Sequence, residues 1–396
     1  MLLLRGSFVM LVCKKRKVDM VTRRKLMIGG AAVLGLGGAG YWLSRKKPVP
    51  IGFEVSEQQL ADARAFLDEN PAFDVHAHPG RTFVRGAKGL TPKLKLYQAL
   101  GTFEDRVVED MQAGGMAAAS FATVSDFNVL EATDTGLKTA RDFAPGEAWA
   151  SFELQNANMR KLIDKGLVAE LKQPADLDTA RAAGETGAWL TAEGGDFLEG
   201  SAERVAEAHQ RGLRSITLMH YRNSEIGDII TTDAVHHGLT PAGKSVIEAM
   251  NNLGMMIDVA HASEATAFGA LASTSQPVLC SHTHIKSDRV PDNPRFISKE
   301  LATEIVTGGG LIGAWPAGLG ISDMNGLVDR VFDLIDHVGV DHVCLGTDMD
   351  ANYKPVMDNY RQTPTLVAGL LARGLSRDET AKIMGGNFIR LWKQIS

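Results

Sequence analysis

The chain has 396 residues, of which 44% are hydrophobic and 22% are charged, so it can form one large α/β domain with an extension or two smaller domains. Its formal net charge is -5, and the body of the chain carries no basic run, which argues against a nucleic-acid partner. The three cysteines, Cys13, Cys280 and Cys344, are an odd number without pairing-friendly spacing, which excludes a disulfide framework. Cys280 and Cys344 lie in apolar runs and are expected to be buried thiols.

The first 50 residues are expected to form a signal or anchor with a short linker, followed by one domain over residues 51–396. Arg23 and Arg24 precede an uncharged stretch of small and apolar residues, in the segment "TRRKLMIGGAAVLGLGGAGYWLSRKK". This segment resembles a twin-arginine export signal, which implies a periplasmic or cell-envelope location. A plain membrane anchor with basic flanks is the alternative, and the two are not exclusive.

The sequence does not decide whether this segment spans a membrane, whether it is cleaved, or where the chain starts. The apolar run is shorter than the about 20 residues that a spanning helix usually needs. No clear cleavage site follows it, so the sequence decides neither whether the signal is removed nor whether the chain starts at Met1 or Met20. Any membrane association would occur through this segment.

Beyond the linker, short apolar runs alternate with amphipathic stretches, a pattern typical of repeated βα units and a parallel sheet. Helix ends are marked by local signals. Thr240 followed by Pro241 predicts a helix start, and Gly254 predicts the end of that helix. Ser376 predicts the start of a later helix, and Gly385 predicts its end.

Each of six apolar runs ends in a residue that can bind a metal ion or transfer a proton. These are "AFDVHAH" with His76 and His78, "GAWLTAEGG" with Glu193, "RSITLMH" with His220, "MMIDVAH" with His261, "PVLCSH" with His282, and "HVCLGTD" with Asp348. In a (β/α)8 barrel the carboxyl ends of all strands meet on one face. An open doubly wound sheet would use only the strands around its switch point. Six contributing runs therefore favour a closed (β/α)8 TIM barrel.

The donor types predict zinc. Residues two apart in a strand share a face, so His76 and His78 project together. Imidazoles and a carboxylate suit Zn²⁺, and five protein ligands exceed the needs of one tetrahedral ion. We therefore expect two zinc ions, with His76 and His78 on one, His261 and His282 on the other, and Glu193 bridging them.

Such a centre can activate water. A bound metal lowers the pKa of water from about 15.7 to about 7, which yields a metal-bridging hydroxide that can attack a carbonyl carbon. Asp348 is then expected to shuttle the proton, and His220 to donate a hydrogen bond to the developing oxyanion. Taken singly, Asp348 could cap a helix and His220 could be structural. His284 is interpreted as structural, with a supporting role beside the ligands as the alternative.

Longer stretches carry a family resemblance. They are "AEGGD" at Glu193, "RSITLMH", "GLTPAGKSVIEAMNNLGMMIDVAHAS" over residues 238–263, "PVLCSH", "NPRFIS" at Arg295, "DHVCLGTDMD" and the terminal "GGNFIRLW". Together they resemble the membrane (renal-type) dipeptidases, peptidase family M19, of the metal-dependent amidohydrolase group. The resemblance implies a (β/α)8 barrel whose binuclear zinc site hydrolyses dipeptides, often with a D-residue at the C-terminal position.

The resemblance implies the same roles for the ligands, for Asp348 and for His220 as the residues alone suggest. It adds Arg295, whose guanidinium would bind the substrate's C-terminal carboxylate as a bidentate fork; a surface arginine beside a helix start is the alternative. One position departs from the family, which usually has His-x-Asp where this chain has His78. The site thereby gains about one unit of positive charge, which could lower the pKa of the bound water or change the metal preference.

The expected function is therefore a zinc-dependent dipeptidase acting on a small dipeptide. One alternative is an amidohydrolase acting on another small amide, a lactam or a lactone. Phosphodiester substrates are disfavoured, because no Lys/Arg cluster accompanies the strand ends. The other alternative is a non-catalytic, metal-binding envelope protein. The sequence decides neither the dipeptide, nor its stereochemistry, nor the number of subunits, a homodimer included.

Overall fold

The computed structural model describes residues 49–88, 95, 99, 103–133 and 136–396, and its compact unit begins at Val49. The predicted signal or anchor, with Cys13 and the arginine pair, lies outside the described residues. Within the described part of the chain, no helix is both long enough and apolar enough to cross a membrane.

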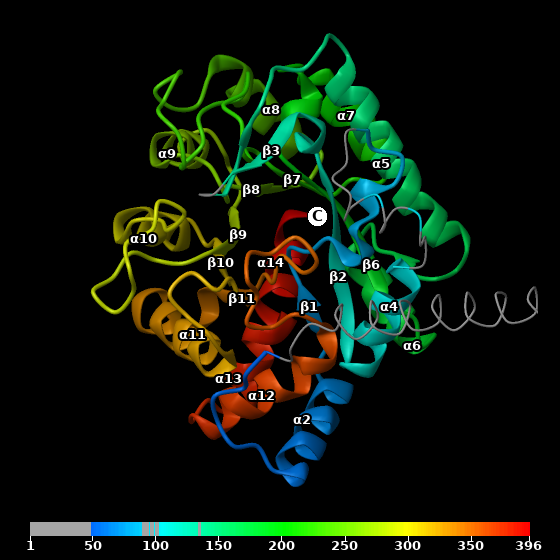
Figure 1. The fold of residues 1–396 in the computed structure, drawn as a ribbon, viewed down its shortest axis with the longest axis vertical. Helices are drawn as coiled ribbons and strands as arrows, with labels where there is room; N and C mark the ends of the chain where they lie inside the picture. The colour runs from blue at the N-terminus through cyan, green and yellow to red at the C-terminus, as the bar shows by residue number, and fades with distance from the viewer. Residues whose placement is uncertain (1–48, 89–94, 96–98, 100–102, 134–135) are drawn as a thin grey trace, which may run out of the picture. The chain divides into compact units, whose positions relative to one another are not determined.

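Eight parallel strands close into a barrel, which confirms the predicted (β/α)8 fold (Figure 1). Neighbouring strands follow one another in chain order, and the circle closes where β11 pairs with β1. The barrel strands are β1 (Ala72–Asp74), β2 (Met116–Val124), β6 (Gly187–Glu193), β7 (Ser215–Thr217), β8 (Met256–Asp258), β9 (Leu279–Thr283), β10 (Leu311–Ala314) and β11 (Val343–Leu345). β5 (Ala169–Glu170) extends the edge of β6, and β3 (Leu130–Thr133) pairs with β4 (Gly136–Thr139) in a separate hairpin.

Helices surround the strands (Figure 1). They are α2 (Glu57–Glu69), α4 (Phe103–Ala113), α5 (Glu147–Asp164), α6 (Pro174–Ala182), α7 (Glu203–Gln210), α8 (Pro241–Asn252), α9 (Glu264–Leu271), α10 (Lys299–Thr307), α11 (Met324–Val338), α12 (Thr363–Ala372), α13 (Arg377–Ala381) and α14 (Asn387–Ile395). Short 3-10 turns are η1 (Pro79–Val84), η2 (Phe127–Val129), η3 (Asp196–Leu198), η4 (Val340–His342) and η5 (Tyr360–Gln362), and η6 (Lys382–Gly386) is a π turn.

The predicted helix starts are confirmed, and one predicted end is wrong. Thr240 caps α8, its hydroxyl accepting from the Gly243 amide at 3.0 Å, and Ser376 forms a capping box at α13. Gly385 does not end a helix, because it lies inside the π turn that joins α13 to α14. A Cβ at this position would lie 2.2 Å from the carbonyl oxygen of Pro71, so the glycine serves close backbone packing.

The C-terminal helix α14 fills the end of the barrel at which the strands begin. Phe388 and Trp392 pack with Phe73 and Trp189, and the rings of Phe73 and Phe388 lie 4.5 Å apart. The same cluster includes the first residues of β8, β9 and β10. Cys344 belongs to it as well, and both Cys280 and Cys344 are buried free thiols as predicted. This packing leaves the carboxyl ends of the strands as the open face of the barrel.

Two glycines let β10 and β11 approach β9 closely. A Cβ on Gly313 would lie 1.7 Å from the carbonyl oxygen of Ser281, and a Cβ on Gly346 would lie 1.8 Å from the same atom. Neither distance is compatible with a side chain. The backbone that carries His282 is therefore held in place by contacts that only glycine permits.

This close approach predicts the effect of a small substitution. Gly313→Ala should lower the free energy of unfolding by about 2–4 kcal/mol, because the added methyl group overpacks the backbone of β9. Gly308→Ala is the matched control, since a Cβ there meets its nearest atom at an ordinary 3.5 Å. Chemical denaturation of both variants measures the difference, and equal stability would contradict the role given to Gly313.

Candidate metal centre

The site is built around the carboxylate of Glu193, the last residue of β6, which is only 2% exposed. Its two oxygens lie within 3.5 Å of ring nitrogens from five histidines. For Oε1 the Nε2 distances are 3.3 Å (His76), 3.1 Å (His261) and 3.5 Å (His282), and for Oε2 they are 3.2 Å (His78) and 3.2 Å (His220).

All five predicted ligands meet, and they divide as the sequence suggests. One group contains His76, His78 and Glu193, and the other contains Glu193, His261 and His282. Within each group the ligand atoms lie within 4.8 Å of one another, and every member is buried. Glu193 is common to both groups, so its carboxylate is placed to bridge two ions.

Hydrogen bonds assign the free ring nitrogen of two of these histidines. Nδ1 of His78 lies 3.2 Å from the Ala122 carbonyl oxygen, to which it can only donate. Nδ1 of His282 lies 2.9 Å from the hydroxyl of Ser281, which itself donates to Asp258 at 2.6 Å. Both rings therefore carry their proton on Nδ1 and direct the Nε2 lone pair at Glu193. Buried lone pairs aimed at one carboxylate fit a cation between them, and imidazole donors fit zinc.

The electrostatics of the site favour a charged carboxylate. Burial alone would raise the pKa of Glu193, but His220 and His76 hold it well below its usual range. Burial would lower the pKa of His76, but the charge and hydrogen bond of Glu193, together with the charges of Asp348 and Asp258, raise this pKa to about 8. Burial keeps the pKa values of His261 and His282 well below normal. A metal ion would take the place of the proton on His76.

The backbone is strained at two of the site residues. His261 has a φ of 65° and Asp348 a φ of 53°, in the left-handed region that non-glycine residues seldom adopt. Each lies three residues after the end of its strand, β8 and β11 respectively. Both side chains line the cavity at the barrel mouth.

Asp348 and His220 lie beside the ligands, as predicted. Oδ1 of Asp348 is 3.5 Å from Nε2 of His78, and burial, followed by the charge of Glu193, raises the pKa of Asp348 to about 6. His220 donates through Nδ1 to Asp126 at 2.6 Å, and Asp126 also accepts from the Tyr221 amide at 3.0 Å. Burial would lower the pKa of His220, but Asp126 and Glu193 raise it to about 9.

Arg295 lies in the loop between β9 and α10 and is buried, at 6% exposure, unlike a surface arginine. Its guanidinium stacks over the ring of Trp315 at 5.0 Å. Nε and one terminal nitrogen have no hydrogen-bond partner among the described residues. A buried guanidinium with unmatched donors is suited to a ligand carboxylate.

Three buried carboxylates that accept hydrogen bonds from residues around the site were not predicted from the sequence. Asp126 follows β2, a run rich in alanine that was not recognised as a strand. Asp74 accepts from the Thr347 amide at 2.9 Å and from the hydroxyl of Tyr360 at 2.8 Å. Asp258 accepts from Thr217 and from Ser281. The sequence does contain a signal for Asp74 and Asp258. Each is followed by valine and comes shortly before a candidate ligand, in "FDVHAH" and "IDVAH".

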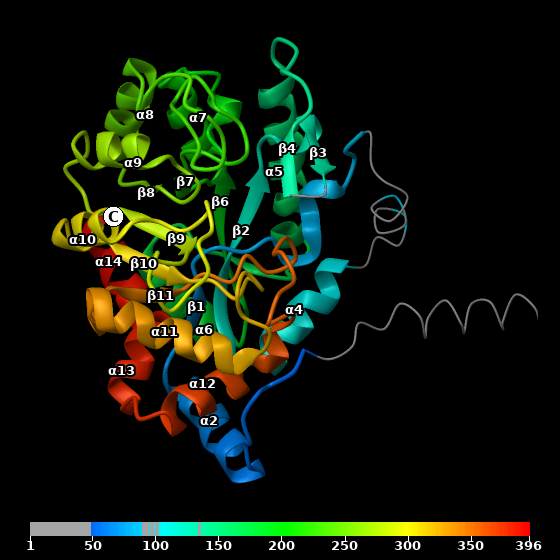
Figure 2. The same cartoon turned by 60° about the vertical axis from the view of Figure 1, so that its left-hand side comes forward.

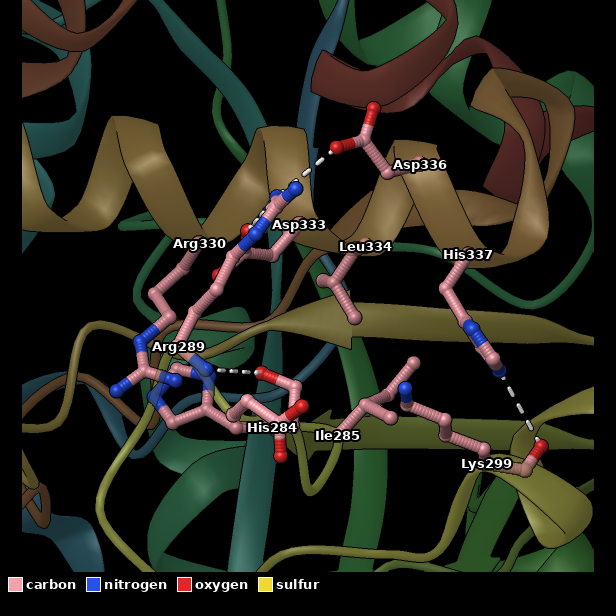
Figure 3. A pocket seen from close by; sticks show the side chains of 11 residues that line it. His284, Ile285, Arg289, Lys299, Arg330, Asp333, Leu334, Asp336 and His337 are labelled. Carbon is pink, nitrogen blue, oxygen red and sulfur yellow. Dashed lines mark hydrogen bonds and ion pairs between the residues drawn. The ribbon is translucent and has the colours of Figure 1, made fainter.

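A cavity of about 270 Å³ lies between α11 and the loop after β9, and none of the residues grouped around Glu193 lines it (Figure 3). Its charged groups pair with each other, since Arg289 contacts Asp333 at 2.7 Å and Asp336 at 3.0 Å. His284 lines this cavity and packs against Phe296, with ring centroids 4.9 Å apart. It does not join the groups around Glu193, in keeping with its interpretation as a structural histidine.

The fold is similar to solved structures of metallopeptidases. The probable dipeptidase PvdM from Pseudomonas aeruginosa matches with a TM-score of 0.71 and 17% identity, covering 86% of this chain and 99% of that chain. A metallopeptidase from Rhodobacter sphaeroides, liganded with a phosphinate mimic of L-Ala-D-Ala, matches with a TM-score of 0.68 and 17% identity, covering 83% and 99%. At these identities the likeness concerns the fold alone.

Curated relatives are named dipeptidases. Dipeptidase tcpJ of Claviceps purpurea (strain 20.1) is 31% identical over 226 residues, which are 54% of this chain and 52% of that protein. Dipeptidase verJ of Clonostachys rogersoniana is 28% identical over 219 residues, which are 54% and 56% respectively. The chain spans about half the length of the curated relatives it matches. The model of the membrane dipeptidase family matches residues 62–396, and the chain therefore belongs to this family, peptidase family M19.

Proposed function

We propose that the protein is a zinc-dependent dipeptidase that hydrolyses the peptide bond of dipeptides, including those with a D-residue at the C-terminus. The observation that carries this proposal is the carboxylate of Glu193, which is shared by two groups of buried imidazoles that could each hold a metal ion. Membership of the M19 family supports peptide-bond hydrolysis, and the nitrogen-rich donor set supports zinc.

The ligands have defined places in this proposal. His76 and His78 would hold one ion, His261 and His282 the other, and Glu193 would lie between them. Two bound zinc ions would supply an activated water as the nucleophile and polarise the scissile carbonyl. With a second imidazole at His78, the first group has a softer donor set than a His-x-Asp pair would give.

The other candidate site residues have proposed roles in proton transfer and in substrate binding. Asp348, with a pKa near 6, would accept a proton from the attacking water and deliver it to the leaving nitrogen. His220, protonated on both ring nitrogens, would donate from Nε2 to the carbonyl oxygen while its Nδ1 donates to Asp126, whose negative charge favours the protonated ring. Arg295 would bind the substrate's carboxylate with its unmatched donors.

We also propose that the protein is exported to the periplasm or cell envelope. The support is the pair Arg23 and Arg24 followed by an uncharged apolar run, as in a twin-arginine signal. Retention by an uncleaved segment would give membrane association.

Metal content and turnover test the proposal together. The purified protein should carry about two equivalents of zinc by elemental analysis and should cleave L,L- and L,D-dipeptides until a chelator is added. His282→Ala should reduce the zinc content, whereas His337→Ala, a change of a half-buried histidine on α11 outside the two ligand groups, should leave it intact. Bound metal without turnover of any dipeptide would contradict the proposed activity.

The assignment of Asp348 predicts a separation of metal binding from catalysis. Asp348→Asn should retain the zinc content but lower kcat by about 10²–10⁴-fold, because the amide cannot accept the proton of the attacking water. Asp341→Asn removes an exposed carboxylate in η4 and serves as the control, with activity close to that of the wild type. Comparable activity of the two variants would show that another group carries the proton.

Asp126 is predicted to act through His220. Asp126→Asn should retain zinc and lower kcat/KM about 10- to 100-fold, because His220 loses the carboxylate charge that favours its protonated, donating form and holds its ring in place. In a His220→Asn background the same change should have little further effect, as expected for two residues that act as one unit. Additive losses in this double-mutant cycle would refute the coupling.

A further inference from the structure

We propose that the preferred dipeptides carry a large apolar or aromatic side chain on their amino-terminal residue. This inference rests on the proposed function and names the substrate class of the same site. The side chain would be received by an apolar wall that consists of Phe83, Phe127, Leu130 and Leu137.

The cavity over the metal centre has two chemically different parts. It measures about 230 Å³, and its polar part is formed by Glu193, His220, His261 and Asp348. The apolar wall forms another side. Phe83 and Phe127 meet edge to face at 4.8 Å, and Phe83 joins Val124 in an apolar cluster distinct from the main core. An apolar surface next to convergent polar groups is typical of a ligand site in which a side chain is recognised by burial.

Neighbouring contacts give the orientation of the substrate. The ring of Phe83 lies 5.6 Å from that of His78, so the apolar wall borders the first ligand group. Arg295 stacks on Trp315, whose ring lies 5.5 Å from that of His282 in the second group. A dipeptide with its carboxylate at Arg295 and its scissile carbonyl at Glu193 therefore directs its amino-terminal residue toward the apolar wall.

Part of the apolar wall is formed by a segment that lies outside the barrel strands. After β2 it forms η2 and the β3–β4 hairpin, which lies beside α5 (Figure 2). The hairpin is fixed to the barrel mouth, because the hydroxyl of Thr139 donates to the Tyr221 carbonyl oxygen at 3.0 Å. Leu137, on β4, nevertheless keeps 44% of its surface exposed while it lines the cavity. A ligand side chain packed there would remove this apolar surface from water.

The charged side chains of Arg81 and Asp350 at the same cavity are engaged in hydrogen bonds with the backbone. Nε of Arg81 donates to the backbone carbonyl oxygen of Asp350, and the carboxylate of Asp350 accepts from the Gly80 amide at 2.8 Å. The wall residues themselves carry no charge. Burial of a phenylalanine or leucine side chain against them should favour such substrates over glycine by about 10- to 100-fold in kcat/KM.

The test compares dipeptides that differ only in the first residue, Gly-Ala, Leu-Ala, Phe-Ala and Glu-Ala, with the zinc-loaded protein. Phe-Ala and Leu-Ala should have the highest kcat/KM values. Leu137→Asp should lower kcat/KM for Phe-Ala at least about tenfold and change Gly-Ala little, because the carboxylate places a charge in the wall. Leu154→Asp on α5, where Leu154 is 40% exposed and does not line the cavity, is the matched control.

The outcomes separate this inference from the proposed function. If no dipeptide is cleaved by the wild type, the proposed function itself is wrong. If dipeptides are cleaved without preference for an apolar first residue, or if Leu137→Asp and Leu154→Asp have the same effect, the dipeptidase assignment stands and the apolar wall is not the subsite. If thermal melting shows that Leu137→Asp does not fold, Phe127→Ala replaces it and should reduce the preference for Phe-Ala in the same direction.

Discussion

The barrel mouth depends on one buried carboxylate. An ionised glutamate removed from water is strongly unfavourable unless positive charge and hydrogen-bond donors surround it, and Glu193 satisfies this requirement with five imidazoles. These histidines come from or directly follow four other strands, so they can converge only if the strand ends are aligned. The geometry of the whole open face is therefore tied to the position of a single side chain.

Three further carboxylates hold that face in place. Asp74 connects the end of β1 to Thr347 after β11, Asp258 connects β8 to β7 and β9, and Asp126 connects the end of β2 to His220. Each one accepts several hydrogen bonds, which compensates for its burial. The ligands are thus oriented by an outer layer of fixed acceptors, the arrangement that keeps a metal site organised before an ion arrives.

The sequence was sufficient for the barrel and for the meeting of the five candidate ligands, because a parallel barrel brings every strand's carboxyl end to one face and each candidate follows an apolar run. It was insufficient for Asp126, because β2 is rich in alanine and its β-branched residues, Thr123 and Val124, come only at its end. The prediction that Gly385 ends a helix was wrong because this glycine serves a close approach to Pro71, which is far away in the sequence and leaves no local signal. The wall formed by Phe83 and Leu137 joins segments far apart in the chain, and only the folded arrangement reveals it.

The pairing of β11 with β1 has a consequence for how the protein matures. The barrel becomes a ring only when its last strand reaches its first, a contact of long sequence separation that is slow to form in folding. A half-synthesised chain can present His76, His78 and Glu193, but not His261 and His282, which complete the second group. Under the proposed function, the second ion would therefore be bound late, and its affinity would add to the stability of the closed ring.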